Sequence, residues 1–171
     1  MNRVAAACVI AAMVGPGLSG CSKESPDWRP ITAEELKALP GYENRTGPGG
    51  DFLSATGDFN GDRVPDRVVF MRDMTDGMAQ FMVILGANKG VMPVGGFRPE
   101  DIPKVGVARV PPGVYHLACE REEGVATACE APNVTFEKDA INIFAFNSTG
   151  TYMYYLGGGF RNLGMSERPT L

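Results

Sequence analysis

The sequence predicts a mainly β, antiparallel domain with one short N-terminal helix, arranged as a single sandwich or a partly open barrel. Short segments dense in Val, Ile, Phe and Met recur between clusters of Gly, Pro, Asp and Asn, the pattern of strands joined by turns. Helical segments of about 10 to 15 residues do not alternate with them, which argues against a parallel sheet of β-α-β units. With 171 residues, 44% of them hydrophobic, the chain suffices for one domain with its own core.

The first 20 residues have the pattern of a signal peptide. Arg3 supplies a positive start, and residues 4–14 form an unbroken apolar run that is too short for a bilayer span of about 20 residues. The tetrapeptide LSGC at 18–21 resembles the lipobox of bacterial lipoproteins. The resemblance implies that Cys21 carries a diacylglyceryl thioether and becomes an acylated, palmitate-bearing N-terminus, and that Ser22 favours the outer membrane. An ordinary signal peptide with a chance cysteine is the alternative.

Three regions follow from this reading. Residues 1–20 are the lipoprotein signal peptide, residues 21–31 are the lipidated N-terminus and a polar linker, and residues 32–171 are the β-rich globular domain. The expected location is the bacterial cell envelope, with the domain held to the outer membrane and facing the periplasm. The formal net charge of -4 and the absence of a Lys and Arg cluster exclude nucleic acid as an expected partner.

The elements can be placed in order. Thr32 and Glu35 form a capping box that predicts a short helix over about 32–39, stopped by Pro40 and Gly41. Residues 67–72 and 78–85 predict a hairpin because turn residues lie between them. Further strands are expected at 91–94, 105–110, 113–119, 133–138, 140–147 and 151–156. The glycines at 157–159 are expected to form a loop.

The remaining cysteines predict a disulfide. Cys8 leaves with the signal and Cys21 is taken by lipid, so Cys119 and Cys129 are left in a compartment that permits disulfides. Closing so short a loop contributes about 3 kcal/mol in the chain-entropy model. A metal site formed by both cysteines and His116 is the alternative, although a fourth ligand is not evident nearby.

The strongest chemical signal is the stretch GDFNGDRVPD at 57–66. Alternate residues of an extended turn direct their side chains toward one centre, and a hard cation such as Ca²⁺ takes six to eight oxygen ligands. Pro65 holds the preceding residue extended, which exposes its carbonyl. The expected ligands are the side chains of Asp58, Asn60, Asp62 and Asp66 and the carbonyl of Val64.

This stretch resembles the calcium loops of FG-GAP and VCBS-type β proteins, which implies a structural Ca²⁺. Arg63 departs from their pattern because glycine stands there in the family, at a left-handed position where another residue costs about 1–2 kcal/mol. An EF-hand is excluded, since its twelfth position is Val69 and a strand follows. A hydrogen-bonded Asx turn without metal is the alternative. A broader likeness, including residues 51–56, is to small proteobacterial envelope proteins, and it brings no activity with it.

Together these features predict a non-enzymatic, lipid-anchored envelope protein with a calcium loop and an envelope protein as its partner. His116 is the only histidine, and no nucleophile or orienting carboxylate is evident beside it. One alternative is a periplasmic inhibitor or immunity protein against a lysozyme-like enzyme or toxin, by analogy with small anchored β-barrel inhibitors. An envelope hydrolase that uses His116 is the other.

Overall fold

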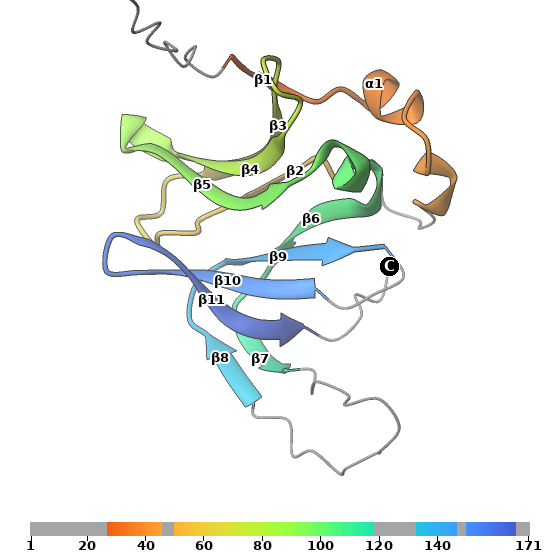
Figure 1. Ribbon diagram of the computed structural model, residues 1–171. Coiled ribbons are helices and arrows are strands. Elements are labelled where there is room, and N and C mark those ends of the chain that lie inside the picture. The colour runs from red at the N-terminus through yellow and green to blue at the C-terminus, as the bar shows by residue number, and fades with distance from the viewer. Residues whose placement is uncertain (1–26, 46–49, 118–132, 147–149, 167–171) are drawn as a thin grey trace, which may run out of the picture.

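The computed structural model describes residues 27–45, 50–117, 133–146 and 150–166. Across these residues the chain is mostly antiparallel β structure, with two main sheets that face each other and a few short helices (Figure 1). The sheets do not close into a barrel. This confirms the predicted fold class and favours the sandwich over the partly open barrel.

The first sheet has the order β1-β3-β4-β5, and β2 pairs with β3 beside β1. The predicted hairpin is confirmed by the pairing of β3 with β4. One boundary differs from expectation: β1 lies inside the stretch expected to be linker, and its three residues pair with residues 71–73. The sheet therefore begins at Trp28 and not after residue 31. The strands are β1 (Trp28–Pro30), β2 (Ser54–Gly57), β3 (Asp66–Asp73), β4 (Ala79–Leu85) and β5 (Gly90–Phe97).

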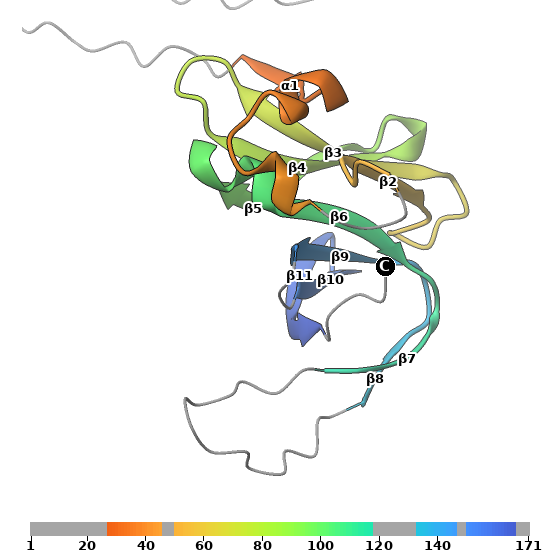
Figure 2. The same ribbon diagram turned by 90° about the vertical axis from the view of Figure 1, so that its right-hand side faces the viewer.

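The second sheet has the order β11-β10-β9-β6. Its edge strand β11 was not expected from the sequence. Gly157 and Gly158, with φ of 59° and 87°, form a two-residue turn that returns the chain along β10. A separate ribbon of β7 and β8 extends away from both sheets (Figure 2). The strands are β6 (Val105–Val110), β7 (Gly113–His116), β8 (Asn133–Phe136), β9 (Ala140–Ala145), β10 (Gly150–Leu156) and β11 (Gly159–Ser166).

The helices are short and lie at the periphery. The predicted helix is α1 (Ala33–Lys37), and both halves of its capping box form, since Glu35 N–H donates to Thr32 Oγ1 and Thr32 N–H to the Glu35 carboxylate. The described part of the chain also contains three 3₁₀ helices: η1 (Tyr42–Asn44), η2 (Gly86–Asn88) and η3 (Pro99–Lys104). Within the described ranges, no helix is long and apolar enough to cross a membrane.

Apolar side chains of both sheets form the main core. Phe70 and Phe81 stack at 4.2 Å between ring centroids, and Phe97 meets both rings edge-on. Val107 and Ile141 face them from the second sheet, and both are almost fully buried. The core therefore fixes the two sheets against each other, which is the frame that positions the acidic loop.

Candidate functional site

The acidic loop joins β2 to β3. Gly57 pairs with Asp66 across its base, and the Phe59 side chain is completely buried, so the loop is pinned to the core. Arg63 has φ of 66°, which confirms the left-handed backbone expected at this position. The strand that follows starts at Asp66, as the exclusion of an EF-hand requires.

Asp58 organises the middle of the loop through its carboxylate. Its two oxygens accept hydrogen bonds from the N–H groups of Gly61 and Arg63, both at 2.8 Å. The left-handed Arg63 thus offers its N–H to an anion, and this bond offsets part of the backbone strain.

Asn60 and Asp62 form the next turns. Asn60 Oδ1 accepts the N–H of Asp62 at 2.9 Å, and Asp62 Oδ1 accepts the N–H of Val64 at 2.8 Å, which are Asx turns. Lys89, which follows η2, donates to Asp62 Oδ2 at 2.6 Å. The Lys89 ammonium, the Val64 N–H and the Asn60 amide lower the pKa of Asp62 from its usual value to about 2. Asp62 in turn raises the pKa of Lys89.

Asp66 closes the loop from its buried side. Its carboxylate is 1% exposed and accepts the N–H groups of Phe59, Asn60 and Gly86, at 2.9, 3.2 and 2.8 Å. Gly86 comes so close that an added Cβ would lie 2.5 Å from a methyl of Val64. Asp66 therefore ties the loop to the end of β4, and only glycine fits at position 86 without a shift.

Three residues that the sequence did not single out link the loop to the second sheet. Asp139 accepts the N–H of Asp58 at 2.8 Å, and its other oxygen pairs with Arg109 Nε at 2.9 Å. Lys138 Nζ donates to the carbonyl of Asn60 at 3.1 Å. Lys138 and Asp139 lie in the turn between β8 and β9, about 80 residues along the chain, so no local sequence pattern connects them with the loop.

The five expected ligands are all oxygen atoms, which are the ligands that calcium prefers. The contacts of the loop are those of a hydrogen-bonded Asx turn, in which backbone N–H groups and Lys89 meet the carboxylates. Among the residues described, no group of three or more Asp, Glu, His or Cys side chains is placed to hold a metal. Both oxygens of Asp58 and one oxygen each of Asp62 and Asp66 accept a single hydrogen bond and keep a second lone pair, so the loop can still offer oxygens to a cation.

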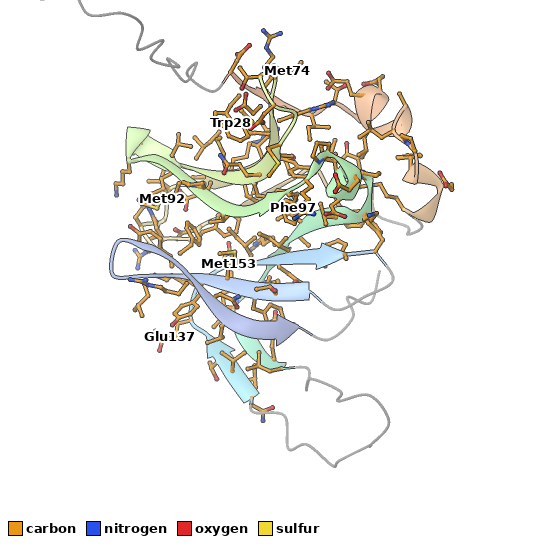
Figure 3. All side chains as sticks on the ribbon, in the orientation of Figure 1. Trp28, Met74, Met92, Phe97, Glu137 and Met153 are labelled. Atoms are coloured by element: carbon orange, nitrogen blue, oxygen red, sulfur yellow. The ribbon has the colours of Figure 1, made fainter. Side chains whose placement is uncertain are left out.

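A cavity of about 470 Å³ lies between β5 and the second sheet. Phe97, Ile143 and Met153 supply much of its apolar lining, and Thr151 and Asn162 contribute polar side chains. Figure 3 shows Phe97 and Met153 between the two sheets. No Asp, Glu, Lys, Arg or His is among the described lining residues, so this lining has no pair of acid and base groups.

The other predicted site residues have side chains that the structure does not describe. Cys21, Cys119 and Cys129 lie outside the described residues, and so does the side chain of His116 at the end of β7. Lipidation and the disulfide therefore stay predictions.

A scan against protein-family models, a search of curated proteins and a search of solved structures each found no match. Function is therefore inferred from the residues of this chain and their contacts.

Proposed function

We propose that this is a lipid-anchored protein of the bacterial cell envelope that works by binding an envelope partner and not by catalysis. The apolar run at 4–14 and the LSGC tetrapeptide support the anchor on Cys21. The described lining of the cavity, which is mostly apolar and includes no ionisable side chain, supports a binding role. In this proposal Cys119 and Cys129 form a disulfide in the exported domain, and the domain faces the periplasm from the outer membrane.

The acidic loop is, in the same proposal, a structural calcium site. The observation that carries it is the position of the loop, which holds β3 to β4 through Asp66 and reaches the second sheet through Asp139. Asp58, Asn60 and Asp62, with the Val64 carbonyl and Asp66, would hold the ion. Calcium would neutralise carboxylates that stand close together, and binding would fall in the range of extracellular modules, with Kd of about 10⁻⁴ to 10⁻³ M.

Thermal unfolding in calcium and in chelator tests the loop. At 10 mM calcium these Kd values correspond to about 1.4–2.7 kcal/mol, or a rise in Tm of roughly 3–10 °C. Asp58→Ala and Asp62→Ala should abolish the rise. Asp76→Ala is the matched control, because Asp76 also accepts a backbone N–H but lies in the turn between β3 and β4. Equal melting curves in calcium and chelator would remove the calcium site from the proposal.

Membrane fractionation tests the anchor independently. Cys21→Ser should move the protein from the membrane fraction to the soluble one, and continued membrane association would contradict lipidation. Alkylation of the denatured protein without reductant, followed by mass spectrometry, checks the disulfide, since Cys119 and Cys129 should stay unmodified only if they are bridged. Crosslinking in native envelopes identifies the partner, and recovery of a lysozyme-like enzyme would favour the inhibitor over other binding roles.

A further inference from the structure

The turn between β3 and β4, together with β1 beside it, forms an exposed apolar tip made of Trp28, Met74 and Met78. Met74 is 50% exposed, Met78 is 37% exposed, and Trp28 is partly exposed. The Met74 N–H donates to the Asp27 carbonyl at 3.0 Å, and Trp28 pairs with Asp73 in the sheet. The apolar tip is therefore held together by backbone bonds, and Figure 3 shows Trp28 and Met74 at one end of the molecule.

The chain upstream of the tip leads to the proposed lipid anchor. Seven residue steps separate Cys21 from Trp28, and at about 3.3–3.6 Å per residue they span at most roughly 25 Å. Acyl chains on Cys21 thus keep the apolar tip within that distance of the bilayer. The ribbon of β7 and β8 lies at the opposite end of the domain (Figures 1 and 2).

Two arginines near the apolar tip are paired with carboxylates. Arg29 lies 2.8 Å from Asp27, and Arg98, just beyond β5, lies 4.0 Å from Glu100. Asp76 accepts the Met78 N–H at 2.9 Å within the turn. With two cationic and three carboxylate side chains in this set, there is no positive excess to attract anionic lipid, and the apolar side chains decide the contact.

We infer that the apolar tip docks on the lipid bilayer, with Trp28 at the level of the headgroups and Met74 and Met78 against the outer part of the acyl chains. Tryptophan is enriched at this depth because its ring is apolar and its N–H is polar. The inference rests on the lipid anchor of the proposed function. It assigns the domain one orientation, with the tip on the membrane and the β7–β8 ribbon directed away from it.

Trp28 is itself the reporter, because it is the only tryptophan in the chain. The lipidated protein is reconstituted in phosphatidylcholine vesicles with and without acyl chains brominated at the carbons nearest the headgroup, where the bromines quench an indole at the headgroup boundary. Docking predicts a blue shift and a loss of Trp28 emission in the brominated vesicles. The loss should change little between low and high salt, since paired charges contribute little to docking.

Matched variants separate docking from tethering. The double variant Met74→Asp, Met78→Asp should lose the quenching and still co-sediment with the vesicles through its lipid. Val114→Asp is the control, because Val114 is 64% exposed on β7 at the far end and should keep the quenching. Both methionines are exposed, so the double variant should still fold, and circular dichroism checks this. If the double variant does not fold, Met74→Asp alone takes its place.

Each outcome separates docking from the anchor. Co-sedimentation with unquenched Trp28 overturns docking and leaves the anchor standing. Equal quenching in the tip variant and the parent protein overturns the role of the methionines. A parent protein that fails to co-sediment overturns the anchor, and docking with it.

Discussion

Asp66→Ala should be among the most destabilising single substitutions in the loop, with or without calcium. The carboxylate is almost fully buried and accepts three backbone N–H groups that belong to the loop and to the residue after β4. Alanine leaves all three without that acceptor. The predicted defect is thus structural, although the sequence marked Asp66 as a metal ligand.

The expected size follows from the burial of the three donors. A buried N–H that loses its partner costs about 1–3 kcal/mol. The Phe59 N–H is buried and should show the full cost, whereas the N–H groups of Asn60 and Gly86 are partly buried and water can replace part of their bonds. The sum is about 3–5 kcal/mol, a large fraction of the roughly 5–15 kcal/mol that stabilises a typical domain.

Urea unfolding in the presence of a chelator measures this cost without any contribution from calcium. Asp76→Ala is the control, because Asp76 accepts one N–H in an exposed turn and its loss should cost less than about 1 kcal/mol. Asp66→Asn should fall between the two, since one oxygen remains to accept. If Asp66→Ala unfolds within about 1 kcal/mol of the parent protein, the hydrogen-bond reasoning is refuted.

Three further predictions concern the surroundings of Asp66. Gly86→Ala should destabilise by about 1–3 kcal/mol, because its Cβ would overlap Val64, while Gly96→Ala, whose Cβ meets open space, should stay within about 0.5 kcal/mol; urea unfolding compares them. Asp62 has a lowered pKa in the folded state, so its contribution is present above about pH 4 and is lost as the pH falls toward 2; Asp62→Asn should flatten the acid limb of stability against pH. Lys89→Met should raise calcium affinity several-fold in titration calorimetry because it frees Asp62, and an unchanged affinity would show that Lys89 does not compete.

The sequence located strands where the side chains themselves favour β structure. The segment expected at 105–110 is β6 (Val105–Val110), and the expected hairpin is β3 with β4. It missed β1, β2 and β11, which are short or rich in polar and small residues. These strands owe their conformation to hydrogen bonds with neighbours already in the sheet, and single-sequence patterns do not contain that information.

The contacts of the acidic loop likewise fall into a group that the sequence predicted and a group that it did not. Its Asx turns and the left-handed Arg63 were readable because they depend on residues two to five positions apart. Lys89 and Asp139 were not, because they lie 27 and 81 residues from their loop partners, and only the packing of the sheets brings them close. The sequence thus identified the oxygen-bearing side chains of the loop. It did not identify the distant residues, Lys89 and Asp139, that bind the loop in the folded domain.

The contacts of the loop decide what calcium could change. The bond from the Asp58 N–H to Asp139 uses no loop carboxylate, so a cation on the loop would leave this link to the second sheet intact. Backbone N–H groups on Asp58 can also persist, since each of its oxygens accepts one N–H and keeps a second lone pair. On Asp66 only Oδ1 keeps one, because Oδ2 accepts the N–H groups of both Phe59 and Asn60. Asp62 Oδ2 accepts both the Lys89 ammonium and the Asn60 side-chain amide, and of these two contacts the charged Lys89 is the one that calcium replaces. Because Lys89 already offsets charge there, the domain should fold in chelator, and calcium should raise its Tm without being required for folding.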